Sequence, residues 1–180
     1  MRYDRYEKEG GVHWDWFEDP TQQWYRVLVN NSLKYLVEER GLVLDVGCGD
    51  GRVDKILIEL GFGVVGIEPE IAGCNIARER VPEMTIINAN VENTDIPSAD
   101  FLYSLNTIEH VKKPEIYLDI MKKIRRFGMV ITDNGELHRG GKYHEREYTV
   151  QELENLFSGL KTERLDLGMV DFIGLKIWQN

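Results

Sequence analysis

The chain has 180 residues, of which 42% are hydrophobic and 29% are charged, and its formal net charge at pH 7 is −9. These values are typical of one globular domain with a well-buried core. The acidic balance argues against a broad nucleic-acid surface, which needs a concentrated basic face, and no stretch has the length and apolarity of a membrane span.

Two features predict a cytoplasmic protein. The first twenty residues are charged and aromatic, without the apolar stretch of a signal peptide. Cys48 and Cys74 lie outside any disulfide or zinc-binding pattern.

Residues 1–40 are expected to form an aromatic helical segment. A helix should follow Pro20 and run on to Gly41, with Leu28 and Leu36 on its apolar face. The aromatic side chains would cover the edge of a sheet, form a lid or wall on the acceptor side of a site, or contact a second subunit in a homodimer. They are Trp14, Trp16, Phe17, Trp24 and Tyr25.

Residues 41–180 alternate between predicted strands and helices. Strands are expected at 42–46, 64–67, 85–88, 99–105 and 129–131. The helices between them include one starting at Pro69, one with Ile116, Ile120 and Ile124 on one face, and one opened by a Thr149–Glu152 capping box. Two final strands, near 161–167 and 170–178, should pair at the sheet edge.

This order predicts an α/β fold, a three-layer Rossmann-like doubly wound sheet. About seven strands are expected, mostly parallel, with an antiparallel strand at the C-terminal edge.

The turn after the first of these strands is the most informative motif. It reads Asp45-Val46-Gly47-Cys48-Gly49-Asp50-Gly51, and the next strand ends on Glu68. Glycines bring backbone close to a ligand, and a carboxylate at the following strand end suits ribose hydroxyls. The spacing is GxGxG rather than the dinucleotide GxGxxG, and Asp45 and Asp50 would repel a pyrophosphate. A cationic, phosphate-free nucleoside is therefore expected, namely S-adenosylmethionine.

Together these motifs resemble the class I S-adenosylmethionine-dependent methyltransferases over roughly residues 40–178. Besides the glycine turn, the resemblance rests on Gly66-Ile67-Glu68-Pro69, Asn90-Val91-Glu92, Ser104 to Val111, and His144 to Thr149. The last two segments are similar to the small-molecule branch that includes ubiquinone-pathway O-methyltransferases. The resemblance implies methyl transfer to an oxygen or nitrogen of a small-molecule acceptor.

The cofactor-binding residues expected from these motifs are Asp45, Gly47, Cys48, Gly49, Gly51, Glu68, Pro69, Asn90, Val91, Leu105 and Asn106. Asp45 would orient the methionine amine, and the amides of Cys48 and Gly49 would approach the carboxylate and ribose. Asn90 and Val91 would contact adenine. Where the family often has Pro-Gly-Gly, residues 125–128 read Arg-Arg-Phe-Gly, which suggests a tight turn.

The expected catalytic residues are His144, His110 and Glu109. A histidine has a pKa suited to removing a hydroxyl proton, with His144 the first choice and His110 the second. Residues 133–148, with three glycines, should form a mobile loop over the acceptor site.

Three other functions fit parts of the sequence. An RNA-end methyltransferase would hold a metal at Glu109, His110 and His144, and would need a basic cluster. Its candidates are Arg125, Arg126, Arg139, Lys142 and Arg146. A nicotinamide-dependent oxidoreductase and a non-catalytic cofactor-binding or partner protein on the same fold are the other two.

Overall fold

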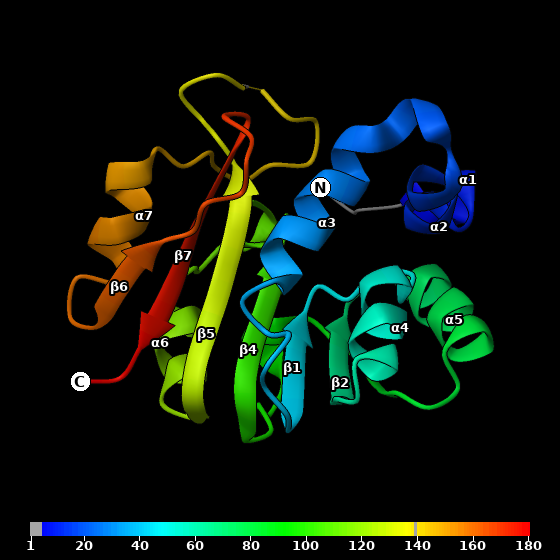
Figure 1. The fold of residues 1–180 in the computed structure, drawn as a ribbon, viewed down its shortest axis with the longest axis horizontal. Helices are drawn as coiled ribbons and strands as arrows, with labels where there is room; N and C mark the ends of the chain where they lie inside the picture. Colours follow the sequence, from blue (N-terminus) through cyan, green and yellow to red (C-terminus); the bar gives the residue numbers. More distant parts are fainter. Residues whose placement is uncertain (1–4, 139) are drawn as a thin grey trace.

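The computed structural model describes residues 5–138 and 140–180, and its centre is a seven-stranded sheet of order β3-β2-β1-β4-β5-β7-β6 (Figure 1). The first five strands are parallel, while β7 is antiparallel to both neighbours, β5 and β6. The predicted sheet is confirmed, and β6 forms its outer edge. The strands are β1 (Leu42–Val46), β2 (Gly63–Glu68), β3 (Thr85–Asn88), β4 (Ala99–Leu105), β5 (Ile124–Asp133), β6 (Lys161–Arg164) and β7 (Phe172–Trp178).

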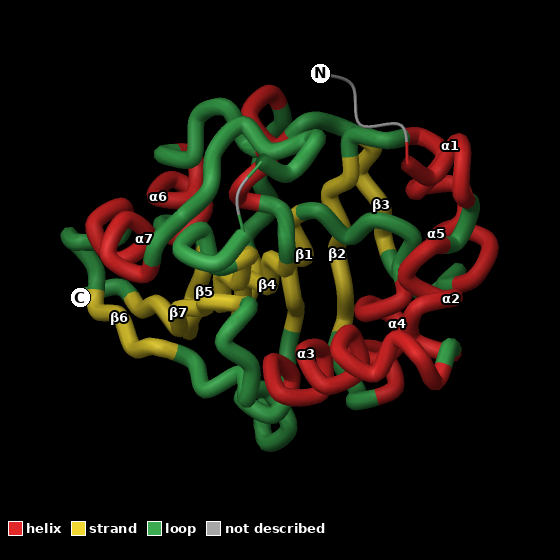
Figure 2. The backbone as a smooth tube through the Cα atoms, turned by 90° about the horizontal axis from the view of Figure 1, so that it is seen from above, coloured by secondary structure: helices red, strands yellow, loops and turns green. Residues whose placement is uncertain are grey.

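Helices cover both faces of the sheet, as Figure 2 shows from above. Three short 3₁₀ turns complete the described elements: η1 (Pro20–Gln22), η2 (Val91–Asn93) and η3 (Ile108–His110). The α-helices are α1 (Arg5–Glu9), α2 (Val12–Glu18), α3 (Gln23–Leu33), α4 (Arg52–Glu59), α5 (Ile71–Arg80), α6 (Ile116–Met121) and α7 (Val150–Leu156).

Two hydrophobic cores lie on opposite faces because side chains alternate along each strand. Val43 of β1 packs in one core with residues of α3, α4 and α5. Leu44, the next residue, packs in the other core with residues of α6 and α7. Burial on both faces explains why the middle of β1, β4 and β5 is apolar at successive positions, as in Leu42–Leu44, Phe101–Tyr103 and Met129–Ile131.

The N-terminal segment covers a face of the sheet rather than its edge. Leu28 and Leu33 of α3 are buried against the central strands. The helix ends at Leu33, earlier than expected, and turns follow to Glu38. Leu36 lies in one of these turns and is buried as well, so the spacing between Leu28 and Leu36 in the sequence resembles that of a longer helix.

Three further predictions about local structure were wrong. Ile124 belongs to β5, where it pairs with Ala99; a buried strand residue next to a helix gives the same four-residue spacing as the helix itself. Residues 125–128 also lie in β5, at a register shift opposite Ala99 and Phe101, instead of in a tight turn. Pro69 precedes α5 by two residues, because Glu70 is its N-cap.

Other local predictions are confirmed. The capping box is present, with the Thr149 side chain accepting from the Glu152 amide and the Glu152 side chain accepting from the Thr149 amide. The final two strands pair antiparallel. Over the described residues, each helix is too short or too polar to cross a bilayer.

Candidate functional site

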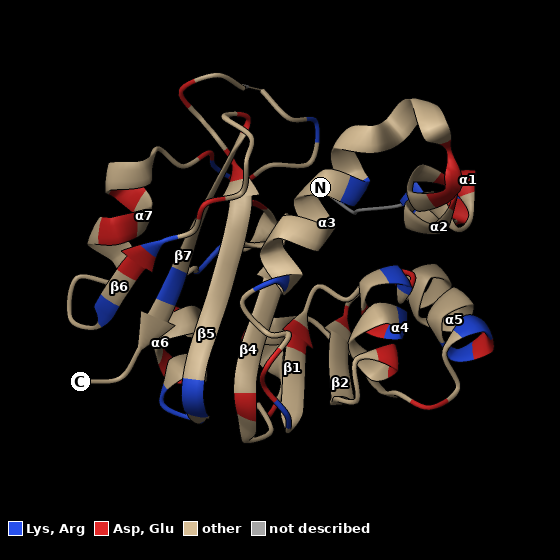
Figure 3. Ribbon diagram, in the orientation of Figure 1, with Lys and Arg blue, Asp and Glu red and all other residues tan. Residues whose placement is uncertain are grey.

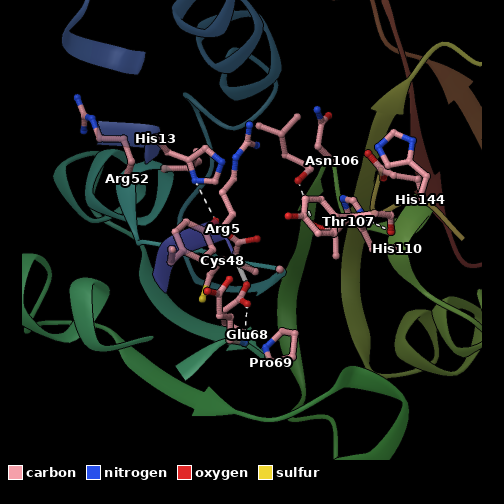
Figure 4. Close-up of a pocket in the computed structure, with 18 of the residues that line it drawn as sticks. Arg5, His13, Cys48, Arg52, Glu68, Pro69, Asn106, Thr107, His110 and His144 are labelled. Atoms are coloured by element: carbon pink, nitrogen blue, oxygen red, sulfur yellow. Dashed lines mark hydrogen bonds between the residues drawn. The ribbon is translucent and has the colours of Figure 1, made fainter. Parts of the chain in front are cut away.

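A cavity of about 1080 Å³ opens at the carboxyl ends of β1, β2, β4 and β5. In open α/β sheets ligands bind at this edge. Figure 4 shows His13 and Arg52 on one side of the cavity, His110 and His144 on the other, and Glu68 and Pro69 below. The predicted site residues that line it are Asp45, Gly47, Cys48, Glu68, Pro69, Asn90, Leu105, Asn106, Glu109, His110 and His144.

Gly47 lines the cavity and packs closely against the side chain of Thr107. Its φ of +82° is in the left-handed region, and a Cβ there would lie 2.0 Å from Oγ1 of Thr107. Glycine is therefore required at this position for both conformation and space. The Gly47 amide donates to the Ile67 carbonyl at 2.8 Å, which ties the turn to β2.

Three predicted cofactor residues lie outside the cavity wall. The space above Gly49 is taken by the Tyr6 hydroxyl, which a Cβ would approach to 2.2 Å. Gly51 packs against Ala77 of α5, and Val91 is buried in the core beneath the sheet. These three residues pack against the protein and support the glycine turn and the loop after β3 on the side away from the cavity.

The backbone amides of the turn are engaged within the protein. The Cys48 amide donates to the Ile67 carbonyl at 3.3 Å, and the Gly49 amide donates to Oε2 of Glu68 at 3.1 Å. The sequence predicts that both amides approach the ligand; in this fold each has an acceptor within the protein, Ile67 for Cys48 and Glu68 for Gly49, and these bonds fix the conformation of the turn.

Glu68 is the acidic residue at the end of β2 and is 5% exposed. Its Oε1 accepts from the Glu70 amide at 2.8 Å, so each carboxylate oxygen already has one donor. Each oxygen retains a second lone pair for a ligand hydroxyl. Burial raises the pKa of Glu68 to about 7, although the two backbone amides oppose that rise.

Asn90 and Asn106 occupy two other strand ends. The Asn90 side chain caps η2 by accepting from the Glu92 amide at 2.9 Å, which leaves that oxygen one lone pair for another donor. Asn106 has a φ of +48°, the one positive value among the described non-glycine residues. Its Nδ2 donates to Asp133 at 3.2 Å, whereas its Oδ1 is buried without a partner. A strained residue with an unsatisfied oxygen in a cavity is characteristic of a binding site.

Glu109, His110 and His144 lie together, as η3 and the loop after β5 meet. One ligand atom from each lies within 4.8 Å of the others. Glu109 is 1% exposed, and neither of its carboxylate oxygens has a hydrogen-bond partner. Burial, its largest perturbation, raises the pKa of Glu109 to about 8.

The two histidines differ in their hydrogen bonds. Nδ1 of His110 lies 3.0 Å from the Tyr143 carbonyl, so this nitrogen carries the proton, and burial lowers the pKa of the imidazole. His144 is buried at Nδ1, which has no hydrogen-bond partner, and its Nε2 lies 3.9 Å from Asp133. Asp133 was missed by sequence reasoning, although its place at the carboxyl end of β5 would have indicated it.

These three side chains fit a divalent metal ion. Two imidazoles and one carboxylate are common ligands of Zn²⁺, Fe²⁺ and Mn²⁺, and a buried carboxylate without partners is otherwise costly. The described part of the loop above them is tied down at several points, among them His138 to Asp171 at 3.0 Å and the amide of Gly141 to Glu147 at 3.2 Å.

The N-terminal helices form the opposite wall. Trp16, Trp24 and Tyr25 line the cavity together with Phe172 of β7, whose ring stacks on Trp24 at 5.8 Å. The other two predicted aromatic residues face Arg52 instead, with its guanidinium 4.9 Å from the Trp14 ring and 3.9 Å from the Phe17 ring. His13 and Tyr6 also reach the cavity, and no local sequence pattern indicated Tyr6.

The chain resembles known methyltransferases in sequence and in fold. Residues 44–131 match the family model described as methyltransferase domain. The chain is 22% identical over 145 residues to the mitochondrial ubiquinone biosynthesis O-methyltransferase of Schizosaccharomyces pombe, an alignment covering 71% of this chain and 52% of that protein. It is 28% identical over 92 residues to a ubiquinone biosynthesis O-methyltransferase of Cereibacter sphaeroides, covering 48% and 37%. The chain thus spans about half or less of the length of these curated relatives.

Solved structures share the whole fold. Magnesium protoporphyrin IX methyltransferase from Synechocystis, crystallised with bound SAH, superposes with a TM-score of 0.75 at 15% identity over 98% of this chain and 97% of that one. A SAM-dependent methyltransferase from Aquifex aeolicus gives 0.73 at 20% identity over 93% and 97%. Residues 44–131 thus match a methyltransferase domain, and the chain as a whole shares the fold of S-adenosylmethionine-dependent methyltransferases of solved structure.

Proposed function

We propose that this chain transfers the methyl group of S-adenosylmethionine to an oxygen or nitrogen of a small-molecule acceptor. The observation that carries the proposal is a single cavity joining the glycine turn and Glu68 to Glu109, His110 and His144. Its volume of about 1080 Å³ is slightly above the roughly 300–1,000 Å³ of small-molecule sites, which leaves room for two reactants.

The cofactor would lie along the strand ends. Glu68 and Pro69 would hold the ribose, Asn90 the adenine, and Leu105 and Asn106 the methionine part. Asp45 would accept from the amine, while Gly47 and Cys48 present backbone without bulk. Gly49, Gly51 and Val91 would act through the shape of the loops that they support.

S-adenosylmethionine supplies a methyl group already activated on a sulfonium, so the protein contributes mainly positioning. Holding two reactants in near-attack geometry contributes roughly 7–11 kcal/mol. A general base adds about 10²–10⁴-fold. His144 is the first candidate for this base and His110 the second. His110 qualifies because its lowered pKa keeps the imidazole neutral, and so able to accept a proton, at pH 7. Glu109 would orient these rings.

A metal-assisted form of the same reaction is the second candidate. The partnerless carboxylate of Glu109 beside two imidazoles favours it. A divalent ion held there would bind the acceptor oxygen and lower its pKa.

We propose a small acceptor rather than an RNA end, and a cytoplasmic setting. Figure 3 shows Lys and Arg in short separate stretches with Asp and Glu between them. Of the basic candidates, Arg125 pairs with Asp100 and Arg126 with Glu39, while Lys142 lines the cavity. Arg139 lies outside the described residues.

Calorimetry with S-adenosylhomocysteine tests the cofactor, and transfer of labelled methyl groups to an acceptor panel tests the reaction. We expect binding, a loss of affinity of about tenfold in Glu68→Ala, equivalent to about 1.4 kcal/mol, and transfer to a hydroxylated small molecule. Absence of binding would refute the proposal. Binding without transfer across the panel would favour a non-catalytic protein, and transfer to an oligoribonucleotide end would replace the acceptor class.

A chelator separates the two candidates. If activity is lost with EDTA and restored by Mn²⁺ or Zn²⁺, the metal-assisted form holds. In protein loaded with Co²⁺ as the substitute ion, His144→Ala should then abolish the Co²⁺ absorption bands as well as turnover. Activity that is unaffected by EDTA would leave His144 as a base alone.

A further inference from the structure

His13 and Asp50 form a histidine–carboxylate pair at the edge of the cavity. Nδ1 of His13 lies 3.3 Å from Oδ1 of Asp50, and the His13 amide donates to Oδ2 of the same carboxylate at 2.8 Å. Asp50 is completely buried, and in the described structure both of its oxygens are used on this one residue. The amide bond alone would be enough to anchor α2. The second contact, to the ring, therefore requires an explanation of its own.

The carboxylate fixes which nitrogen of the His13 ring carries the proton. A carboxylate only accepts hydrogen bonds, so the ring donates from Nδ1 to Oδ1 of Asp50. The Tyr6 hydroxyl lies 3.2 Å from the same nitrogen. Among the described residues, all hydrogen bonds of this ring are made at Nδ1. In the neutral ring, Nε2 is therefore left with its lone pair.

The ring lies between the glycine turn and the aromatic wall of the cavity. Its Nδ1 and Cε1 would lie 3.2 Å from a Cβ at Gly49, and its face stacks on Tyr25, with ring centroids 5.5 Å apart and an interplanar angle of 18°. Trp16 packs edge-on at 5.5 Å. His13, Tyr25 and Trp16 all line the cavity, and the His13 side chain is 23% exposed (Figure 4). A cofactor on the turn and an acceptor on the wall would meet beside this ring.

Among the histidines of the chain, His13 alone lines the cavity and has a ring hydrogen bond to a carboxylate. His138 bonds to Asp171 at 3.0 Å but lies outside the cavity. His110 is bonded to a backbone carbonyl, and His144 comes no closer than 3.8 Å to a carboxylate in the described structure. A carboxylate behind an imidazole fixes the tautomer and stabilises the imidazolium that forms when Nε2 takes a proton. If the two opposite imidazoles hold an ion, His13 remains available for that proton.

We propose that His13 is a further catalytic residue, a general base whose Nε2 takes the proton of the acceptor, and that Asp50 is its positioning residue. This inference rests on the proposed function. As the acceptor oxygen bonds to the methyl carbon, its O–H proton passes to Nε2. The carbon–sulfur bond breaks at the same time, and sulfur keeps the electron pair. The imidazolium is stabilised by the Asp50 carboxylate and then releases its proton to water.

The position of the ring proton can be observed without an acceptor. In ¹⁵N spectra of histidine-labelled protein in slightly alkaline solution, the signals of His13 are those absent from His13→Asn. We expect a proton on Nδ1 and none on Nε2. Asp50→Asn should reverse this, because its amide oxygen can still accept from the His13 backbone while its NH₂ group donates to Nδ1 and leaves the proton on Nε2. A proton on Nε2 in wild type overturns the proposal, since that nitrogen then cannot accept one.

Methyl transfer to two phenols measures whether the base acts on the acceptor. Catechol keeps its proton in slightly alkaline solution, whereas 4-nitrocatechol is ionised there and needs no base. With catechol, kcat should fall about 10²-fold or more in both His13→Asn and Asp50→Asn. With 4-nitrocatechol, which bypasses the base, kcat should stay within about threefold of wild type. Affinity for S-adenosylhomocysteine, measured by calorimetry, should remain close to that of wild type.

His138→Asn is the matched control, because it removes the other histidine bonded to a carboxylate, outside the cavity. Its ratio of the two kcat values should equal that of wild type. An equal loss with both phenols in His13→Asn would assign the ring to packing of the wall and overturn the proposal. An unchanged kcat with catechol in Asp50→Asn would overturn it as well. Wild-type protein that binds no S-adenosylhomocysteine would instead refute the proposed function, whatever the tautomer of His13.

Discussion

The backbone amide of His13 donates to the buried carboxylate of Asp50 at 2.8 Å. The His13 ring lies 3.3 Å from the other oxygen of the same carboxylate. One acid of the glycine turn therefore holds the start of α2, and the indole of Trp14 adds a bond to the Asp50 carbonyl at 2.8 Å. This is how a segment outside the matched domain becomes one wall of the site.

Replacing Asp50 with alanine should loosen that wall. The His13 amide would lose its acceptor in a partly buried place, which costs about 1–3 kcal/mol. We expect that loss in urea unfolding, together with faster proteolysis near α1 and α2. Asp15→Ala, which removes an exposed carboxyl from α2, is the control. Equal stability and proteolysis in both variants would show that Asp50 does not anchor the helices.

Gly47→Ala should damage both stability and cofactor binding. The new Cβ would lie 2.0 Å from Thr107 at a φ that disfavours side chains, so the turn must shift. Gly140→Ala isolates the conformational part, because Gly140 has a φ of +83° with nothing within 4 Å. The expected loss is about 1 kcal/mol for Gly140→Ala and larger for Gly47→Ala, measured by urea unfolding, with weaker binding of S-adenosylhomocysteine only in Gly47→Ala. Equal losses of unfolding free energy in the two variants would show that the contact with Thr107 adds nothing to the conformational cost.

Glu109 should make the metal-free protein less stable as pH rises. Burial raises its pKa from 4.5 to about 8 in the folded state, so its contribution to stability is fully present below pH 4.5 and is lost as pH rises through 8. Between pH 7 and 8 the free energy of unfolding should fall by about 1 kcal/mol from this group.

Glu109→Gln removes the titration and should flatten that fall, measured by urea unfolding in the presence of EDTA. Exposed Glu79→Gln should keep the wild-type slope. A steep slope that persists in Glu109→Gln would assign the effect to Glu68 or Asp54, whose pKa values burial raises to about 7.

The capping box of α7 should be worth about 1 kcal/mol. Thr149→Ala removes the oxygen that accepts from the Glu152 amide at 3.2 Å. The midpoint of urea unfolding should fall accordingly, whereas exposed Ser158→Ala should leave it unchanged. No difference between the two variants would mean that packing of Leu153, rather than the cap, holds this helix.

The sequence alone determined those features that depend on neighbouring residues. The run from Leu42 to Gly51 predicts a buried strand and a turn because alternation and glycine are local properties. The acids and amides at strand ends, from Asp45 to Asn106, were predicted to share one edge because parallel strands end together. Glu109, His110 and His144 were predicted from the chemistry of their side chains together with a family resemblance.

Only the tertiary structure decided which distant groups meet. His13 and Asp50 are 37 residues apart, and no local pattern sets their contact. Asp54 is a polar residue of a helix by its sequence, yet packing of α4 against the sheet buries it completely. Ile124 fits a helix by spacing and lies in a strand, because the sheet offers its backbone partners that the helix end does not. Burial and long-range contact, which set pKa values and cavity walls, are properties of the packed chain.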